Sequence, residues 1–401
     1  MSTPAPKPRR RRRALIALGV AGAGVPALWF AINHVPWLGP VLADGARAVL
    51  GPGPVAWLED TAYALQDRID RIRYKDAPPK TFWEAPEAPS GAPAAALPSA
   101  EAQAEKPAEP GAQPVYDGFP PPPFQAPFSN VAAQGDGTWI AMKEPGMAKS
   151  LVHPDPKRSF AAVAVVAIDL RRIDLKMVAG TTEPSSTSVK SDHRPGLIPK
   201  EAGDALIAAF NGGFKTTHGH YGMMLDGETF VPPRDISCTV GLYKDGSIRI
   251  RTWPELKPSE PDMLGYRQTP PCLVEQGKTN TVLDTGEYNR NWGAAVGGET
   301  VIRRSAIGID KDGHTLFYGF GDAVTAQSLS QAMKAIGAMD AAQLDVNYSY
   351  PRFLLYERPA PDAPPKAASS LVPGVKFVSR EYVEEPSPRD FFYLVRRKQT
   401  S

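Results

Sequence analysis

Residues 205–214 read ALIAAFNGGF, and this stretch decides the fold of the part of the chain around it. Six apolar residues, 205–210, are followed directly by Asn211, Gly212 and Gly213. A short apolar run that ends at turn-forming residues is typical of a buried β-strand. Paired glycines after a strand let the backbone turn tightly or approach a ligand closely. The stretch therefore predicts a core strand that ends either at a functional site or at an ordinary hairpin turn.

Further strand signals lie on both sides of this stretch. An apolar run rich in Val and Ala is found at 160–170, a second strand candidate follows at 173–178, and a last one lies at 391–395. Asp-Gly pairs between apolar segments indicate β-hairpins, and such pairs occupy 226–227, 245–246 and 312–313. The surrounding sequence thus predicts several hairpins in a strand-rich domain.

One amphipathic helix is predicted within this domain. Four apolar residues follow the i, i+3, i+4, i+7 spacing of one helix face, namely Leu329, Ala332, Met333 and Ile336. Gly337 is placed to end that helix, and the apolar run 341–346 resumes as a strand. The predicted fold class is therefore α+β, a strand-rich mixed sheet with packed helices, over residues 130–401.

An uncharged run of 19 residues, 14–32, predicts a membrane anchor ahead of this domain. At the helical rise it spans about 28 Å, close to the thickness of a bilayer core. Residues 1–13 include five consecutive arginines, and basic flanks face the cytoplasm. We expect a basic cytoplasmic tail over 1–13, a single-pass transmembrane helix over 14–32 and an extracytoplasmic C-terminal domain. The alternative is a signal peptide cleaved after 41–43, which would release a secreted protein.

Residues 53–75 predict an amphipathic helix, because Pro54 suits the first helical position and apolar residues recur at spacings of three and four. These apolar residues form a seam: Val55, Leu58, Ala62, Leu65, Ile69 and Ile72. The seam is typical of a short coiled coil, or of a helix that lies on a membrane or on its own domain.

The next segment, 76–129, holds 14 prolines together with many Ala, Glu and Ser residues. Such a composition buries too little apolar surface to fold, so it predicts an extended linker. A strip that binds a proline-recognising partner is the alternative interpretation.

Charge and cysteine content exclude several classes of function. The chain has 45 basic and 43 acidic side chains, and six of the basic ones lie in residues 1–13. The rest of the chain is therefore slightly acidic, which excludes the basic footprint of a nucleic-acid-binding protein. Two cysteines exclude a disulfide-rich scaffold and a four-cysteine zinc site. In an oxidising compartment Cys238 and Cys272 form either a disulfide or two buried thiols.

Polar residues after the 205–210 strand form the first candidate site. Asn211 can hydrogen bond a ligand at the strand's exit, and Lys215 follows closely. His218 and His220 would share one face if the segment is extended. They would then suit phosphate or metal binding or proton transfer, and otherwise they are solvated loop residues. No third metal-ligating residue lies at ligand spacing, so no metal site is assigned.

Two further candidates lie at the ends of predicted strands. Arg304 can clamp a phosphate with two parallel hydrogen bonds, unless it is a surface arginine paired with an acid. Asp345 lies near the end of the predicted strand 341–346, where a carboxylate is well placed for catalysis. Its alternative role is to cap the backbone of its own turn.

The order of these features resembles the phosphodiester glycosidase family. The resemblance spans about 160–357 and rests on four short motifs, at 210–214, 267–274, 304–309 and 336–345, where the last is the helix end 336–338 followed by 342–345. The family usually follows the last Leu-Asp with Gly-Gly and small hydroxyl residues. Residues 346–351 of this chain, VNYSYP, are bulkier, so they reshape the wall of the expected pocket.

The resemblance implies a hydrolase that removes a sugar from a phosphodiester in an envelope or extracellular glycan. It implies that Asp345 is the base or nucleophile, that Arg304 holds the phosphate and that Asn211 orients a sugar hydroxyl. The implied substrate-binding residues are Gly212, Gly213, Lys215, His218, His220 and Asn347.

Some features of the expected reaction stay open in the sequence. Asp226 and Glu299 are candidates for a second carboxylate, but only by their nearness in sequence. A non-catalytic glycan- or phosphate-binding envelope protein on the same fold is the alternative function. No cofactor is required by the sequence, and the expected partners are a glycan or sugar phosphate and the membrane, with no nucleic acid.

Overall fold

The computed structural model describes residues 45, 52–84, 118–283, 292–293, 300–360 and 363–397. The chain divides into two compact units, Met1–Ala62 and Tyr63–Ser401. The predicted cytoplasmic tail, 1–13, and transmembrane segment, 14–32, lie outside the described residues. None of the helices within the described ranges combines the length and the apolar character needed to cross a membrane.

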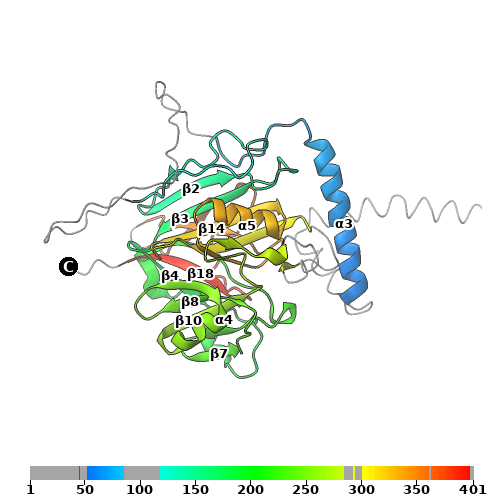
Figure 1. The fold of residues 1–401 in the computed structure, drawn as a ribbon. Helices are drawn as coiled ribbons and strands as arrows, with labels where there is room; N and C mark the ends of the chain where they lie inside the picture. The colour runs from blue at the N-terminus through cyan, green and yellow to red at the C-terminus, as the bar shows by residue number, and fades with distance from the viewer. Residues whose placement is uncertain are drawn as a thin grey trace, which may run out of the picture. The chain divides into compact units, whose positions relative to one another are not determined.

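The second unit contains three β-sheets (Figure 1). The largest has eight strands in the order β1 (Ile140–Ala141), β2 (Met147–Val152), β3 (Val163–Asp169), β14 (Thr315–Val324), β13 (Ile302–Ile309), β15 (Asp340–Gln343), β11 (Val274–Glu275) and β12 (Lys278–Thr279). The second has the order β7 (Glu228–Val231), β6 (Met223–Leu225), β10 (Met263–Thr269), β8 (Cys238–Tyr243) and β9 (Ile248–Thr252). The third has the order β17 (Lys366–Ser370), β16 (Phe353–Glu357), β5 (Leu206–Asn211), β18 (Phe391–Arg396) and β4 (Ile173–Val178).

Helices are few in the described part of the chain. The α-helices are α3 (Pro52–Arg73), α4 (Trp253–Leu256) and α5 (Ala326–Ala335). Short 3-10 turns connect the strands at η1 (Ser191–His193), η2 (Lys200–Ala205), η3 (Thr216–His218), η4 (Lys257–Asp262) and η5 (Thr281–Leu283). The strand-rich character predicted from the sequence is confirmed, and the pairings between these named strands are antiparallel.

The predicted local elements agree closely with the structure. The 205–210 run forms β5, and the three Asp-Gly pairs lie in the hairpins β6–β7, β8–β9 and β13–β14. Helix α5 begins at the cap Thr325, whose side chain accepts a hydrogen bond from the backbone N–H of Ser328 at 2.9 Å. Gly337 has a φ of 92°, the left-handed conformation that suits glycine directly after a helix.

The hydrophobic core lies between the sheets. One apolar cluster joins side chains from all three sheets, among them Ile168, Phe210, Val240 and Ile307. A second cluster forms where α5 packs on β13 and β14, as Figure 1 shows. The strands of the third sheet are therefore held on the large sheet by apolar contact, which is the dominant stabilising term in such a fold.

Cys238 and Cys272 form a disulfide, with their Cα atoms 4.7 Å apart. Cys238 begins β8, and Cys272 lies between β10 and β11. The bond thus ties the second sheet to the segment that leads into the large sheet. Of the two alternatives left by the sequence, the disulfide is confirmed.

The described ends of the predicted linker contact the second unit. Lys80 donates a backbone hydrogen bond to Ser159 at 3.1 Å, and the indole of Trp139 donates to the carbonyl of Pro122 at 3.1 Å. The prediction of an extended linker is therefore wrong for residues 76–84 and 118–129. Despite the proline content, backbone groups of these residues form hydrogen bonds with the rest of the second unit. Residues 85–117 lie outside the described range.

The C-terminal half of α3 is joined to the second unit by a buried ion pair. The guanidinium of Arg158 donates to both carboxylate oxygens of Asp67, at 2.7 and 2.9 Å, and to Asp155 at 2.8 Å. Burial acts to raise the pKa of Asp67, but the hydrogen bonds and charges of Arg158 and Arg71 outweigh it and lower the pKa below 3.8. The ion pair therefore stabilises the fold at neutral pH.

Asp67→Asn should lower the free energy of unfolding by about 3 kcal/mol, because it leaves the buried Arg158 with one fewer anion. A carboxyl whose pKa is lowered by folding contributes stability above its ordinary pKa and loses it as the pH falls. The difference in thermal melting between Asp67→Asn and wild type should therefore shrink below about pH 4. Asp70→Asn is the control, since Asp70 accepts a hydrogen bond from its helix neighbour Gln66. An Asp67→Asn difference that does not decrease at all between about pH 5 and about pH 2 contradicts the assignment.

Candidate functional site

The Gly212–Gly213 turn at the end of β5 brings the backbone against β18. Gly212 donates to the carbonyl of Asp390 at 3.1 Å, and Gly213 donates to its carboxylate at 2.9 Å. A Cβ atom at Gly213 would lie 2.6 Å from the guanidinium carbon of Arg267. Strand β5 pairs with β16 and β18 rather than with the segment that follows it. The hairpin-turn interpretation is therefore wrong, and the close approach that the glycines allow is to the side chains of Arg267 and Asp390.

Arg267 and Asp390 form a fully buried ion pair beside this turn. Two hydrogen bonds join the guanidinium to the carboxylate, at 2.9 and 3.2 Å, and both side chains are 0% exposed. Arg267 also donates to the carbonyls of Tyr221 at 3.1 Å and Gln268 at 2.9 Å. The pair thus connects β10, β18 and the glycine turn at one point.

Asp345 lies beside this pair, two residues after β15, and is 1% exposed. Its Oδ1 accepts hydrogen bonds from the backbone N–H groups of Val346 at 2.8 Å and Asn347 at 3.2 Å. Its Oδ2 is in ion-pair contact with Arg389, but the contact lacks hydrogen-bonding geometry, so Oδ2 makes no hydrogen bond. Asp345 therefore caps its own turn and also presents one oxygen to a buried cation.

Burial raises the pKa of Asp345, and the positive charge of Arg389 only partly offsets this effect. Arg389 donates to the carbonyl of Gly213 at 3.1 Å, and its guanidinium lies 4.3 Å from the ring centroid of Tyr350. The Nε of Arg389 makes no hydrogen bond to the described residues. Asp345 Oδ2 and Arg389 Nε thus lack hydrogen bonds, although the two side chains form an ion pair.

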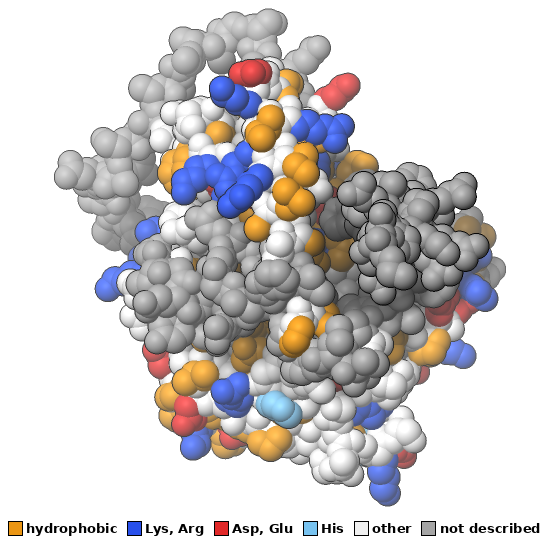
Figure 2. Space-filling view, turned by 90° about the vertical axis from the view of Figure 1, so that its right-hand side faces the viewer, with side chains coloured by type: hydrophobic (Ala, Val, Ile, Leu, Met, Phe, Trp, Pro, Cys, Tyr) orange, Lys and Arg blue, Asp and Glu red, His pale blue; other side chains and the backbone are white. Residues whose placement is uncertain are grey.

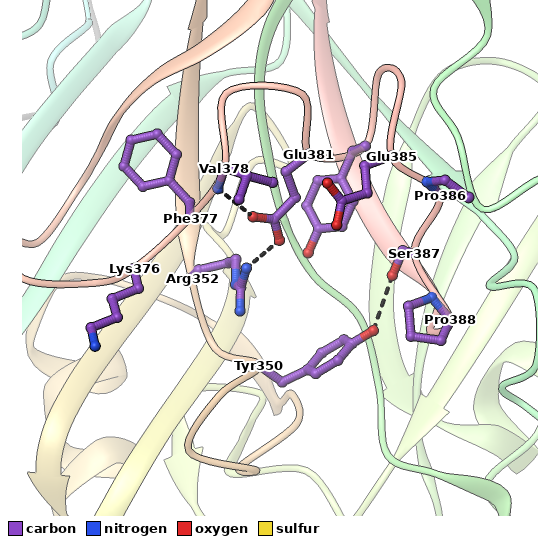
Figure 3. A pocket seen from close by; sticks show the side chains of 11 residues that line it. Tyr350, Arg352, Lys376, Phe377, Val378, Glu381, Glu385, Pro386, Ser387 and Pro388 are labelled. Carbon is purple, nitrogen blue, oxygen red and sulfur yellow. Dashed lines mark hydrogen bonds and ion pairs between the residues drawn. The ribbon is translucent and has the colours of Figure 1, made fainter. Parts of the chain in front are cut away.

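A cavity of about 330 Å³ lies next to this group (Figure 3). Tyr350 and Arg352 form one wall, and the segment 376–388 forms the others. The Tyr350 hydroxyl lies 3.0 Å from the hydroxyl oxygen of Ser387, and Figure 3 shows both at the same side of the cavity. Asp345 is not a lining residue, but its partner Arg389 stacks on the Tyr350 ring.

Glu381 and Arg352 point toward each other in this cavity and form an ion pair (Figure 3). Burial raises the pKa of Glu381, although the positive charge of Arg352 opposes the shift. The Nε of Arg352 is buried and makes no hydrogen bond to the described residues. The buried polar atoms without a hydrogen bond in or beside this cavity are Asp345 Oδ2, Arg389 Nε and Arg352 Nε. Because such atoms are costly to bury, their grouping points to a polar ligand.

Asn211, predicted to bind substrate, is instead a structural residue. Its side chain is 0% exposed, and its Nδ2 donates to the hydroxyl of Ser305 at 2.9 Å. Its Oδ1 accepts from Tyr318 at 3.1 Å and from the backbone of Arg352 at 3.3 Å. These bonds use its donors and acceptors to hold β5, β13 and β14 together, so they leave no group for a sugar hydroxyl.

Arg304, the predicted phosphate clamp, is buried on the other face of β13. Its guanidinium donates to Val324, Gln343 and Thr300 at 3.0–3.1 Å, and also to Trp292. Neighbouring residues of a strand point to opposite faces, and Ser305 is the one that faces Asn211 and Asp345. The prediction that Arg304 and Asp345 face one cleft is therefore wrong.

The remaining predicted residues lie in turns. Lys215 precedes η3, and exposed His218 ends it, while His220 has a φ of 51°. The segment is therefore a 3-10 turn, so the condition under which the two histidines would share a strand face is not met. Asn347 accepts hydrogen bonds from Ser349 and so supports the turn after Asp345.

Of the two candidates for a second carboxylate, only Asp226 is among the described residues, and it does not line the cavity. Asp226 is exposed in the β6–β7 hairpin, and Glu299 lies outside the described residues. Within the described ranges, no group of three His, Cys, Asp or Glu side chains is arranged to hold a metal ion.

Sequence reasoning missed Arg389, Asp390, Tyr350, Arg352 and Glu381. An available signal was the Arg-Asp pair directly before the predicted last strand, 391–395, since charged residues at a strand's entry often lie at a site. Arg267 lies in the motif at 267–274, but its buried partner Asp390 is 123 residues away in the chain. Nothing in the local pattern links such distant residues.

The comparisons with known proteins support the resemblance found in the sequence. The model of the phosphodiester glycosidase family matches residues 204–345, a range that includes Asn211, Arg304 and Asp345. The cavity residues 350–388 follow the matched range. No curated protein matches this chain.

The solved structures that match this chain include the two that follow. The zebrafish N-acetylglucosamine-1-phosphodiester alpha-N-acetylglucosaminidase catalytic domain, auto-inhibited by its pro-peptide, is 15% identical, with a TM-score of 0.39. That match covers 64% of this chain and 86% of the zebrafish chain. A protein of Burkholderia pseudomallei K96243 described as exported is 11% identical, with a TM-score of 0.30 and coverage of 58% and 74% respectively.

Gly213→Ala should destabilise the fold by about 1 to 3 kcal/mol, because the new methyl group would displace Arg267 from Asp390. Gly118→Ala is the control, since a Cβ there meets no atom within 4 Å. Chemical denaturation of both variants measures the effect. Equal stability of the two variants would show that the glycine turn does not need its close contact.

Proposed function

We propose that this chain hydrolyses sugar-1-phosphodiester linkages, with the substrate bound in the cavity lined by Tyr350, Arg352 and residues 376–388. The observation that carries the proposal is the grouping of Asp345 Oδ2, Arg389 Nε and Arg352 Nε, which are buried without hydrogen bonds. The match to the phosphodiester glycosidase family supports the same reaction class. An envelope or extracellular glycan is the proposed source of the substrate.

The phosphate of such a substrate needs cationic partners. Arg352 and Lys376 line the cavity, and Arg389 lies directly behind Tyr350. An arginine Nε with no protein partner can donate to a phosphate oxygen in a charge-assisted hydrogen bond. These three residues therefore take the role that the sequence assigned to Arg304, Lys215 and His218.

The proposed reaction is attack of water on the anomeric carbon. The bond between that carbon and the phosphate oxygen breaks, and the phosphate monoester leaves with the bonding electrons. A carboxylate accepts the proton of the attacking water, and glycosidases usually use two carboxylates for such work. Asp345 and Glu381 are the proposed pair, because Asp345 is buried beside the cavity, Glu381 lines it, and both have raised pKa values.

Access to Asp345 requires that the turn after it moves. Asp345 is 1% exposed, and the Tyr350 ring lies between Arg389 and the cavity. We propose that substrate displaces Tyr350, whose hydroxyl contacts that of Ser387. The same burial favours a second candidate function, a glycan- or phosphate-binding protein that uses the cavity without catalysis.

The cellular location of this activity is also a proposal. It rests on the uncharged run 14–32 and the arginines before it, which would tether the domain outside the cytoplasmic membrane. A phosphodiester in an envelope glycan would then be within reach of the cavity.

Asp345→Asn should lower the rate of hydrolysis by about 100-fold or more, because an amide cannot accept the proton from water. The assay uses the full chain and a panel of hexose- and N-acetylhexosamine-1-phosphate alkyl esters, with release of the phosphate monoester as the readout. Asp226→Asn is the matched control, since Asp226 is exposed in a hairpin turn. Thermal melting of both variants checks that they fold.

Three results would decide between the two functions. Hydrolysis by wild type and its loss in Asp345→Asn alone supports the enzyme. Binding of the same esters by a folded wild type with no hydrolysis supports the binding protein. Hydrolysis by Asp345→Asn at the wild-type rate rules out the catalytic assignment of Asp345.

Arg352→Lys should raise the KM for the phosphodiester and leave kcat within a few-fold of wild type. Lysine keeps the positive charge but has no Nε–H at the position of the unpaired arginine atom. Inhibition by inorganic phosphate should weaken in parallel. A variant whose KM and phosphate inhibition both equal those of wild type would place the phosphate elsewhere.

A further inference from the structure

Helix α3 carries an exposed apolar stripe on the second unit. Leu65, Ile69 and Ile72 are 58%, 48% and 79% exposed. Their spacings of four and three place them on one face of the helix. Figure 2 shows hydrophobic side chains along one side of the molecule with Lys and Arg side chains beside them. The C-terminal half of the apolar seam predicted from the sequence therefore does not pack on the domain.

The opposite face of α3 is the one that holds the helix in place. Asp67 is buried in its ion pair with Arg158, and the Tyr74 ring, just after the helix, lies 5.5 Å from the Phe160 ring. The helix is thus fixed without the stripe. Exposing three large apolar side chains in one row is unfavourable in water, so the row indicates a surface that is covered in use.

The charges beside the stripe identify what covers it. At 100° per residue, Arg68 and Arg73 lie about 60° and 80° from the stripe on its two sides. Asp67 lies on the opposite side, toward the domain. Apolar residues with basic residues on both flanks are typical of a helix that lies in the interface of an anionic membrane.

A second copy of the helix fits this pattern poorly. In the heptad that the seam defines, Arg68 and Arg73 occupy the flanking positions that face a partner helix. A parallel copy would place Arg68 opposite Arg73, and an antiparallel copy would place each arginine near its own counterpart. Both arrangements bring like charges together, which selects against self-pairing.

We propose that residues 63–73 of α3 bind the surface of an anionic lipid membrane. Leu65, Ile69 and Ile72 enter the interface, while Arg68 and Arg73 contact lipid phosphates. The uncharged run 14–32 ends 19 residues before α3 begins at Pro52, so an anchor there would hold the helix near the bilayer. This inference does not depend on the hydrolysis proposed above, and it adds a second contact that orients the domain.

The test uses the full chain in nanodiscs that hold one copy each. Both native cysteines are in the disulfide, so Ile69→Cys introduces a single thiol for a fluorescent probe. The discs contain phosphatidylcholine alone or mixed with phosphatidylglycerol, with a nitroxide-bearing lipid as quencher. Ala64→Cys is the control, because Ala64 is exposed on the same helix about 100° from the stripe.

The probe at Ile69 should be quenched in the phosphatidylglycerol discs, and more strongly than the probe at Ala64. Arg68→Glu combined with Arg73→Glu should abolish that quenching, while hydrolysis of a soluble phosphodiester stays unchanged if that activity exists. An Ile69 probe that is unquenched in anionic discs overturns the proposal. Equal quenching in discs of phosphatidylcholine alone also overturns the proposal, because anionic lipid would then not be needed. A probe that is shielded only at high protein concentration in detergent overturns it as well, because a second copy would then cover the stripe.

Discussion

The buried ion pair between Arg267 and Asp390 is the interaction on which the rest of the site depends. It holds β10 against β18, and the carboxylate of Asp390 also receives the N–H of Gly213. Because Arg389 precedes Asp390, the same contact fixes the guanidinium that meets Asp345. A pair with no solvent exposure stabilises a fold only when its hydrogen bonds are complete, and here glycine at 213 makes the close approach possible.

Two parts of the chain build the candidate site. The first part is the range matched by the phosphodiester glycosidase family, which supplies the glycine turn and Asp345. The second part, 350–388, lies beyond that range and supplies the walls of the cavity with Arg352 and Glu381. The bulky residues after Asp345 join the two parts, since Tyr350 stacks on Arg389 and also lines the cavity. Their size explains why Asp345 is covered in the structure.

Much of the fold was predictable from the sequence, because strands such as β5 and hairpins such as β6–β7 depend on local apolar runs and Asp-Gly pairs. The site was less predictable. Asn211 and Arg304 have the residue types that bind substrates, but tertiary neighbours saturate their hydrogen-bonding groups. Glu381 and Arg389 became candidates only when the fold brought them to Asp345 and Arg352. The burial of a side chain and its hydrogen-bonding partners are properties of the folded chain, so residue type and spacing alone do not reveal them.

The central claim is that the cavity beside Asp345 binds a sugar-1-phosphodiester. A crystal structure of the full chain with a non-hydrolysable sugar-1-phosphonate ester tests it most directly. The account predicts that the phosphonate contacts Arg352 and Arg389, that Tyr350 is displaced and that the anomeric carbon faces Asp345 and Glu381. A ligand bound elsewhere, with Tyr350 still stacked on Arg389, would contradict the account.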